Sequence, residues 1–316
     1  SCYADTNGWI DLTVNGGVPG YSYLWSGPNG YSSSQDSIFN LFAGEYRITV
    51  TDINSCSISD TVFITEPTAL TSSTSLSNFN GFGVSCYADT NGWIDLTVNG
   101  GGASLAYTYS WSNGVTSEDL NDIGVGTYSV TATDANGCTT SETDIITQAD
   151  TIVSSFNTTN WNNYEIQCNG GNNGEITLTV SGGIIALPYS YDIDGVSNST
   201  NVFNNISAGT YLLTATDANG CSTQQIVPMT EPASAIVSSY TQSNFNGFGV
   251  SCYADTNGWI DLTVNGGVGV YTYLWSNSSN SQDLNGIGSG SYNVVAVDEN
   301  GCTTPQTIVI TEPTAL

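Results

Sequence analysis

Residues 1–17 read SCYADTNGWIDLTVNGG, and the same letters return at 85–101 and at 251–267. A looser copy, QCNGGNNGEITLTVSGG, occupies 167–183. All the copies keep a cysteine, an Asn-Gly pair, an alternating Ile-x-Leu-x-Val stripe and a closing Gly-Gly. Alternation with a period of two is typical of a half-buried β-strand, and glycine pairs are typical of the turns around it. The stretch therefore predicts a turn followed by a strand, recurring along the chain.

The cysteines show that these copies belong to a tandem repeat. The first cysteine of each pair is Cys2, Cys86, Cys168 or Cys252, and the second is Cys56, Cys138, Cys221 or Cys302. The spacing between equivalent cysteines is nearly constant, and it is too long for a helical repeat unit. It suits one small β-sandwich per repeat.

The segments ITEP (64–67), ITQA (146–149), MTEP (229–232) and ITEP (310–313) end the repeats. They predict repeat 1 at 1–67, repeat 2 at 68–149, repeat 3 at 150–232 and repeat 4 at 233–313. We expect repeat 1 to lack its first strand and residues 314–316 to begin a following repeat, as in a piece of a longer array. Because proline restricts its own backbone and that of the preceding residue, these short junctions predict a stiff rod.

A second recurring segment indicates the topology. LFAGEYRITVTD at 41–52 returns in altered form at 123–134, 206–217 and 287–298. An apolar residue, then Gly-x-Tyr and an alternating strand, is typical of the tyrosine corner of Greek-key sandwiches. The predicted corner residues are Tyr46, Tyr128, Tyr211 and Tyr292. The sequence thus predicts an all-β chain, a tandem array of four Ig-like (Greek-key) β-sandwich repeats forming a stiff rod.

The charge of the chain excludes several classes of function. The 316 residues include 28 Asp and Glu, no His and a single basic residue, Arg47, for a net charge of −27. Nucleic-acid binding needs clustered cations, and most general bases and metal sites need histidine, so we expect no nucleic-acid partner, no enzyme and no cofactor. No apolar run reaches the roughly 18 residues of a membrane span, so we expect no direct membrane insertion. Trypsin-like proteases should find almost no site.

The recurring segments together resemble a known family. The cysteine, NG-x-I-x-LTV-x-GG, Y-x-Y-x-W, G-x-Y-x-V-x-A/V-x-D-x-NGC and TEP resemble the SprB repeat, and more distantly PKD and related Ig-like modules. The resemblance covers essentially the whole chain. It implies a cell-surface protein of gliding Bacteroidetes, exported by the type IX secretion system, whose repeats form an extended adhesin or filament. It identifies no ligand.

Two cysteines per repeat, in a chain of this composition, indicate disulfides formed in an oxidising compartment. The simplest pairing lies within each repeat and gives Cys2–Cys56, Cys86–Cys138, Cys168–Cys221 and Cys252–Cys302. Closing a loop of about 50 residues stabilises a fold by roughly 4 kcal/mol. The alternative joins neighbouring repeats as Cys2–Cys138, Cys86–Cys221 and Cys168–Cys302, because the two cysteine-bearing turns of an Ig-like repeat are expected at opposite ends of the sandwich. We expect the first pairing and keep the second open.

The acidic turns raise the question of calcium. Asp5, Asn7 and Asp52 carry oxygen atoms in predicted turns of repeat 1 and are candidate Ca²⁺ ligands. Their spacing is not that of an EF-hand loop, and Asp and Asn also cap backbone turns without a metal. Repeat 3 has Gly171 at the position of Asp5. We therefore interpret the three residues as turn formers and expect no specific metal site.

Other residues are candidates for contact or modification. Trp9, Trp93 and Trp259 are expected to face away from the core, toward a neighbouring repeat, an identical chain or a surface glycan. Ser37, Thr61 and Thr151 lie in Asp-Ser/Thr-apolar segments, which resemble sites that Bacteroidetes O-glycosylate.

These observations favour a mechanical function. We expect an extended, protease-resistant stalk in a bacterial adhesin or extracellular filament on the cell surface. Two alternatives stay open: an array of glycan-binding modules that use the exposed tryptophans, and a subunit of a self-assembling fibre. In every case the neighbouring repeats of the same chain are the first partners.

Overall fold

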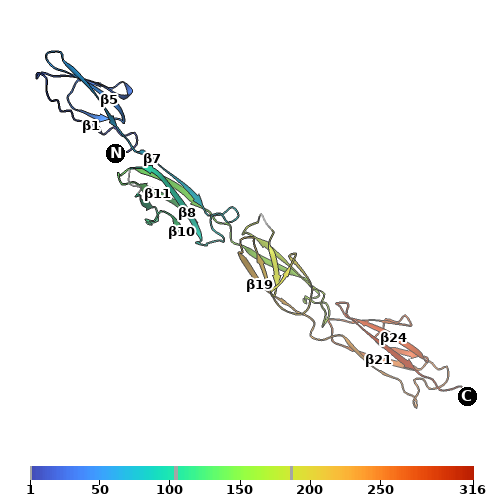
Figure 1. Cartoon of the computed structure of the whole chain (residues 1–316). Helices are drawn as coiled ribbons and strands as arrows, with labels where there is room; N and C mark the ends of the chain where they lie inside the picture. Colours follow the sequence, from blue (N-terminus) through green and yellow to red (C-terminus); the bar gives the residue numbers. More distant parts are fainter. Residues whose placement is uncertain (1, 103–105, 186–187) are drawn as a thin grey trace. The chain divides into compact units, whose positions relative to one another are not determined.

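The computed structural model describes residues 2–102, 106–185 and 188–316. The described residues form 25 β-strands and one short 3-10 helix, η1 (Pro28–Gly30), so the all-β prediction is confirmed. The chain divides into two compact units, Ser1–Ala149 and Asp150–Leu316. Each unit holds two sandwiches, and Figure 1 labels strands in all of them. We keep the names repeat 1 to repeat 4 for the ranges predicted above.

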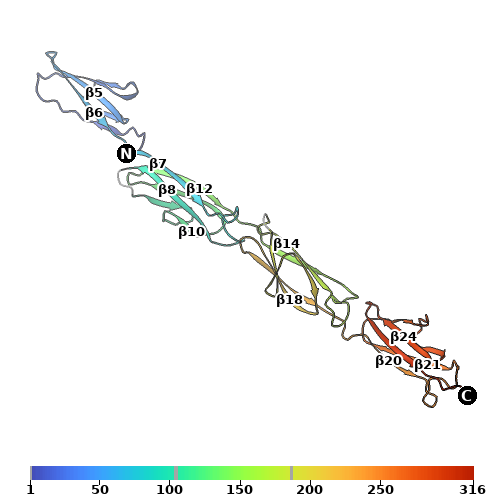
Figure 2. The same cartoon turned by 45° about the vertical axis from the view of Figure 1, so that its right-hand side comes forward.

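Repeat 2 shows the complete sandwich. Its strands are β7 (Thr68–Leu76), β8 (Gly92–Gly101), β9 (Thr108–Trp111), β10 (Leu120–Ile123), β11 (Gly126–Thr133) and β12 (Thr139–Ile146). One sheet has the order β10-β8-β7 and the other β12-β11-β9, with every pair antiparallel. Because β9 belongs to the opposite sheet although it follows β8 in the chain, the connectivity is that of an Ig-like Greek-key sandwich. Figure 2 shows β7, β8 and β12 running alongside one another.

Repeats 3 and 4 have the same connectivity. Repeat 3 contains β13 (Val153–Thr158), β14 (Gly174–Ser181), β15 (Ser190–Ile193), β16 (Val196–Asn198), β17 (Val202–Ile206), β18 (Gly209–Thr216) and β19 (Ser222–Met229). Repeat 4 contains β20 (Val237–Gln242), β21 (Gly258–Asn265), β22 (Thr272–Trp275), β23 (Leu284–Ile287), β24 (Gly290–Val297) and β25 (Thr303–Ile310). The sheets are β13-β14-β17 and β16-β15-β18-β19 in repeat 3, and β20-β21-β23 and β22-β24-β25 in repeat 4.

Repeat 1 has one complete sheet and one reduced sheet. Its strands are β1 (Gly8–Ile10), β2 (Ser22–Ser26), β3 (Ser32–Ser33), β4 (Ile38–Leu41), β5 (Gly44–Thr51) and β6 (Ser57–Ile64). The order β3-β2-β5-β6 matches the four-stranded sheet of repeat 3, and the described residues of repeats 2 and 4 form the same sheet without a counterpart of β3. In the other sheet of repeat 1, β1 pairs only with β4. Among the described residues no strand occupies the other edge of β1, where repeats 2 to 4 have β7, β13 and β20.

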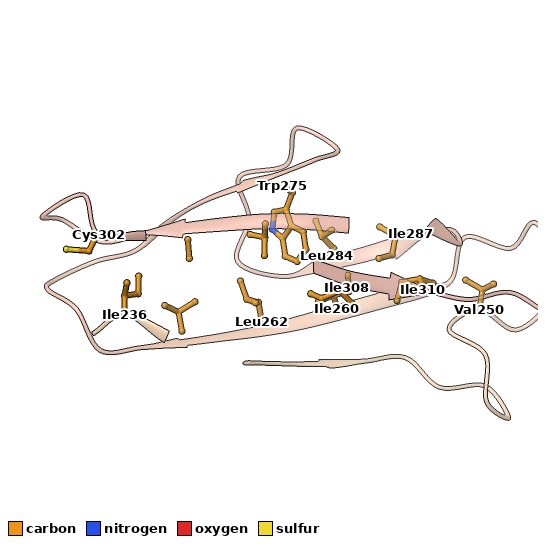
Figure 3. Close-up of a cluster of buried hydrophobic side chains, with 13 residues drawn as sticks. Ile236, Val250, Ile260, Leu262, Trp275, Leu284, Ile287, Cys302, Ile308 and Ile310 are labelled. Carbon is orange, nitrogen blue, oxygen red and sulfur yellow. The ribbon is translucent and has the colours of Figure 1, made fainter. Parts of the chain in front are cut away.

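Each repeat has its own hydrophobic core between its two sheets. Alternation along the second strand of repeat 2 buries Ile94, Leu96 and Val98, which are at most 9% exposed. Trp25, Trp111 and Trp275 from the facing sheet complete the cores of repeats 1, 2 and 4, and Figure 3 shows this arrangement around Trp275. Burying one Leu, Ile or Val side chain contributes roughly 1.5–3 kcal/mol, so these cores hold each sandwich together. The cores fall inside the predicted ranges, whose limits stay a prediction.

All four predicted corner tyrosines make the same type of hydrogen bond. Each hydroxyl donates to the backbone carbonyl oxygen of the residue four positions earlier. The pairs are Tyr46–Phe42 at 3.1 Å, Tyr128–Gly124 at 3.1 Å, Tyr211–Ser207 at 3.1 Å and Tyr292–Gly288 at 3.0 Å. This bond fastens the connection between the sheets in a tyrosine corner. Burial, together with neighbouring Tyr31, raises the pKa of Tyr46 despite the bond to Phe42, so the hydroxyl stays a neutral donor at physiological pH.

Candidate functional site: the cysteine junction between repeats

The turn around the first cysteine is held by the end of the same repeat. In repeat 1 the Cys2 N–H donates to Asp5 Oδ2 at 2.8 Å, and the Asp5 N–H donates to the Cys2 carbonyl at 3.2 Å. Ala4 has a positive φ of 61°, which turns its N–H toward Glu66 Oε2 at 2.6 Å. The same anchor recurs as Ala88 to Gln148 at 2.9 Å, Gly170 to Glu231 at 2.6 Å and Ala254 to Glu312 at 2.8 Å. We call this element the first-cysteine turn.

The turn around the second cysteine is built on an aspartate. In repeat 1 the N–H groups of Asn54 and Cys56 both donate to Asp52 Oδ1 at 2.9 Å, and the Val18 N–H donates to Oδ2 at 3.1 Å. The bond from cysteine to aspartate recurs as Cys138 to Asp134 at 2.8 Å, Cys221 to Asp217 at 3.0 Å and Cys302 to Asp298 at 2.8 Å. We call this element the second-cysteine turn. Its geometry is the same in every repeat.

These hydrogen bonds set the charge state of the aspartates. The backbone N–H groups of Val18, Cys56 and Asn54 lower the pKa of Asp52. Burial of Asp134 raises its pKa, but the backbone N–H donors of Cys138, Gly102, Asn136 and Gly137 together outweigh burial and lower it. Both carboxylates therefore remain ionised well into acidic solution, where they continue to hold the turn.

The two cysteine turns of one repeat lie at opposite ends of the sandwich. Glu66, which anchors the first-cysteine turn, follows β6, whereas Cys56 directly precedes the same strand. An eight-residue strand spans roughly 25 Å, and disulfide Cα atoms lie within about 7 Å of each other. Figure 3 shows the same separation in repeat 4, with Cys302 at one end of the core and Val250, two residues before Cys252, at the other. A disulfide within a repeat is therefore sterically impossible.

The disulfides join neighbouring repeats. Cys2 bonds Cys138 with a Cα–Cα distance of 5.7 Å, and Cys168 bonds Cys302 with a distance of 5.8 Å. The expected within-repeat pairs are wrong: Cys2–Cys56, Cys86–Cys138, Cys168–Cys221 and Cys252–Cys302 are all excluded by these two bonds. The between-repeat alternative matches both, and its remaining pair, Cys86–Cys221, stays a prediction. Cys56 and Cys252 are free and exposed thiols.

The second unit shows what surrounds such a disulfide. Asn300, only 5% exposed, lies in the second-cysteine turn of repeat 4 and fits against repeat 3. Its Nδ2 donates to the carbonyl oxygens of Trp161 and Gln167 at 3.3 and 3.0 Å, and its Oδ1 accepts from Asn162 Nδ2 at 2.6 Å. In return, Gln167 Nε2 donates to the Asn300 carbonyl at 2.7 Å. The Asn300 side chain thus satisfies two backbone carbonyls of repeat 3, and the Gln167 side chain satisfies one of repeat 4. Cys168 packs onto the core of repeat 4.

Sequence reasoning missed two parts of this site. The repeat-ending Glu or Gln was interpreted as a junction signal, but its side chain anchors the first-cysteine turn. The asparagine two positions before the second cysteine was given no role in the junction between repeats, but in repeat 4 it contacts the neighbouring repeat. The recurrence of both residues at a fixed distance from a cysteine was the available signal.

The candidate calcium ligands do not come together. Asp5 and Asn7 lie in the first-cysteine turn, where Asn7 Nδ2 donates to Asp5 Oδ2 at 3.2 Å, whereas Asp52 lies in the second-cysteine turn at the other end of repeat 1. The Asp5 and Asp52 carboxylates accept backbone N–H groups, as the turn interpretation expects. In the described parts of the chain, no group of three or more His, Cys, Asp or Glu could hold a metal ion.

The remaining candidates lie on the surface. Trp9 is 64% exposed, and Trp93 and Trp259 are each 38% exposed. Thr61 and Thr151 are exposed, whereas Ser37 is half-buried and its Oγ donates to Asp11 Oδ1 at 2.7 Å. Trp9 lines a surface hollow together with Cys2 and Glu66 of the first-cysteine turn. No helix among the described residues is long and apolar enough to cross a membrane.

The fold and the junction define a class: tandem Ig-like sandwiches whose neighbours are joined by disulfides. The family model of the SprB repeat matches the chain at 1–30, 84–116, 165–198 and 250–280, so the resemblance noted from the sequence is confirmed. Each match spans a first-cysteine turn and the strand after it. The chain therefore matches the SprB repeat model at four places.

Comparisons with whole proteins are less informative. No curated protein matches the sequence. A Ca²⁺-stabilised adhesin with which an Antarctic bacterium binds ice is 15% identical, over 93% of this chain and 90% of that one, with a TM-score of 0.37. A tetra-tandem repeat from the extending region of a large adhesion protein is 13% identical, over 99% of this chain and 94% of that one, with a TM-score of 0.26. Scores this low support no conclusion, so the assignment rests on the strand order and the repeat family.

Proposed function

We propose that this chain is a structural, non-enzymatic repeat region of a bacterial cell-surface adhesin or extracellular filament, and that it acts as a stalk. The observation that carries the proposal is the pair of disulfides between neighbouring repeats, Cys2–Cys138 and Cys168–Cys302. Disulfides persist in oxidising compartments outside the cytoplasm. The matches to the SprB repeat support the same location and export by the type IX secretion system in gliding Bacteroidetes.

The connectivity of the disulfides suits a load-bearing role. A pulling force that enters before Cys2 passes through the disulfide to Cys138, so the residues between them carry no tension even if their sandwiches unfold. The bond between Cys168 and Cys302 shields the second unit in the same way. The sequence separations are 136 and 134 residues, and at roughly 3.3 Å per residue each bond withholds about 450 Å of extension. A stalk built this way keeps its length under load.

Single-molecule stretching tests the stalk function. The oxidised chain is pulled from its two ends before and after reduction with a phosphine. We expect the oxidised chain to release only the residues outside the two loops, and reduction to add about 900 Å of contour length in total. The Cys2→Ser, Cys86→Ser, Cys168→Ser variant, which also removes the predicted Cys86–Cys221 bond, is the control and should behave like the reduced chain. Equal extension before and after reduction would contradict the proposal.

Protease resistance belongs to the same proposal. Arg47 is the single trypsin site, and although its side chain is 70% exposed, its backbone lies inside β5, paired on both sides. Proteolysis requires an extended, accessible backbone, so we expect the folded chain to survive trypsin. Rapid cleavage after Arg47 in the native chain would contradict this part.

The exposed tryptophans favour a second candidate, an array of glycan-binding modules. Trp93 and Trp259 present aromatic faces on equivalent strands, and sugars stack on such faces. A glycan array probed with the chain and with the Trp93→Ala, Trp259→Ala variant separates the two functions. Binding that disappears in the variant supports the second candidate, and no binding by either protein favours the stalk.

A further inference from the structure

Hydrogen bonds join repeats 3 and 4 independently of the disulfide between them. Asn300 Nδ2 donates to the carbonyl oxygens of Trp161 and Gln167, and Asn300 Oδ1 accepts from Asn162 Nδ2. Gln167 Nε2 donates in return to the Asn300 carbonyl oxygen at 2.7 Å. None of these atoms belongs to a cysteine, so the contact can form while both sulfurs of the junction are still thiols. We call this set of bonds the asparagine network.

The turn that carries Cys302 is held by other atoms. The Cys302 N–H donates to Asp298 Oδ1 at 2.8 Å, and the Gly301 N–H donates to the Asp298 carbonyl oxygen at 3.0 Å. The three hydrogen bonds of the Asn300 side chain all go to repeat 3. Replacing Asn300 therefore removes contacts between the repeats and leaves the turn around Cys302 closed.

The asparagine network lies directly beside the two sulfurs. Gln167 precedes Cys168 in the chain, and Asn300 lies two positions before Cys302. The two cysteine Cα atoms are 5.8 Å apart, within the roughly 7 Å that a disulfide spans. Cys302 Sγ lies 3.3 Å from the Gln167 carbonyl oxygen, so a thiol at this position has an acceptor for its weak S–H donor. The docked arrangement thus suits the two thiols as well as the disulfide.

We propose that Asn300 and Gln167 are positioning residues for oxidation: they dock repeat 4 onto repeat 3 first, and the docked contact then directs Cys302 to Cys168. The chain has eight cysteines, which allow on the order of a hundred complete pairings. Docking raises the effective concentration of one thiol at the other, so this bond forms faster than a bond between undocked turns. The inference is independent of the stalk function, since it concerns how the bond forms and not the load that it carries.

The bond forms by exchange with a small disulfide such as oxidised glutathione. Cys168 is partly exposed and Cys302 is only 7% exposed, so the small disulfide reaches Cys168 first. The Cys168 thiolate attacks one sulfur of the small disulfide, forms a mixed disulfide and releases one small thiolate. The Cys302 thiolate then attacks the Cys168 sulfur and releases the other small thiolate. The two protein thiols lose two electrons and their two protons, and the small disulfide gains the electrons.

Reoxidation of the intact chain tests the positioning role. The chain is reduced with a phosphine under native conditions, transferred to oxidised glutathione and alkylated at intervals, and peptic peptides report each bond. We expect Asn300→Ala to slow formation of Cys168–Cys302 by roughly fivefold or more. The Cys2–Cys138 bond in the same sample should form at the wild-type rate, because Asn300 lies in the other junction. An unchanged rate for Cys168–Cys302, or equal slowing of both bonds, would overturn the proposal.

A double-mutant cycle separates positioning from a general loss of stability. Asn162→Gly removes the donor to Asn300 Oδ1 from the side of repeat 3, and glycine tolerates the positive φ of 47° at this position. We expect it to slow the Cys168–Cys302 bond as well. The Asn162→Gly, Asn300→Ala chain should be no slower than Asn300→Ala alone, because both changes remove the same contact. Slowing that multiplies in the double variant would show that the two residues act separately, and the proposed docking would be wrong.

Discussion

Residues 1–17 and 85–101 have identical sequences and different structures. The later copy forms β8 over Gly92–Gly101, whereas the earlier copy forms β1 over Gly8–Ile10 only. Leu96 is 2% exposed in the complete repeat, and its counterpart Leu12 is only partly buried. The difference lies in the neighbour, because β7 pairs along β8 and the described residues supply no such strand beside β1. Strand length is therefore a property of the sheet and not of the segment.

The turns of the same two copies do not differ. The Cys2 N–H donates to Asp5 Oδ2 at 2.8 Å, and the Cys86 N–H donates to Asp89 Oδ2 at 3.2 Å. The bond from the residue with positive φ to the repeat-ending Glu or Gln is also present in both. Hydrogen bonds that both copies make thus fix the cysteine turn, whereas the strand depends on a neighbouring strand that the described residues supply only beside the later copy.

The largest expected effect comes from truncating the leucine in the two copies. We expect Leu96→Ala to destabilise its repeat by about 3 kcal/mol, because it leaves a cavity in a closed core. Leu12→Ala should cost about 1 kcal/mol, since the side chain is already partly in water. Urea unfolding of each variant with the disulfides intact measures both values. Equal losses would mean that the first strand does not complete the core.

Hydrogen exchange can compare the two copies directly. Their unprotected amides have the same intrinsic exchange rates, because the sequences are identical. We expect amides of 95–99 to exchange at least a hundredfold more slowly than those of 11–15, since β7 and β8 pair across this stretch. Fragments must extend past Gly101 or Gly17, where the sequences diverge, so that mass spectrometry distinguishes them. Matching rates would show that the strand forms without its neighbour.

The asparagine of the second-cysteine turn allows a second comparison, because Asn300 is bonded to a neighbouring repeat and its counterpart Asn54 is exposed. Asn300→Ala should cost roughly 1–3 kcal/mol, because it leaves the Trp161 and Gln167 carbonyls without a donor in a buried junction. Asn54→Ala should change stability by less than about 0.5 kcal/mol, since the same side chain is exposed there. Thermal unfolding of the two variants side by side checks the difference. A large loss in Asn54→Ala would contradict it.

The smallest effect is the acid sensitivity of the second-cysteine turn. The folded pKa values of Asp52 and Asp134 lie below the ordinary value, so both stabilise the fold above pH about 3.9. That contribution falls as the pH drops through the folded pKa, because the unfolded chain binds the protons first. We expect Asp134→Asn to flatten the dependence of the melting temperature on pH below about 4. An unchanged slope would show that the Asp134 carboxylate does not contribute to the dependence of stability on pH.

The sequence predicted what depends on local pattern. Alternation placed Ile94, Leu96 and Val98 in the core, and Gly-x-Tyr located the tyrosines that bond back across the corner. The sequence did not predict the disulfide pairing. A loop within one repeat is the simplest closure, and the choice between it and pairing between neighbouring repeats depends on which end of the sandwich each cysteine occupies. The anchor from Ala4 to Glu66 decides that point, and it joins residues far apart in the chain. The contact of Asn300 with a different repeat was unpredictable for the same reason.

Disulfide mapping without reduction tests the central claim most directly. The chain offers trypsin one site, so pepsin is the suitable protease, and free thiols are alkylated first. The sequences around Cys56, Cys138 and Cys302 differ, so the second cysteine identifies each crosslinked pair. The account predicts peptides that join Cys2 to Cys138 and Cys168 to Cys302, with Cys56 and Cys252 alkylated. A peptide that joins Cys2 to Cys56 would contradict it.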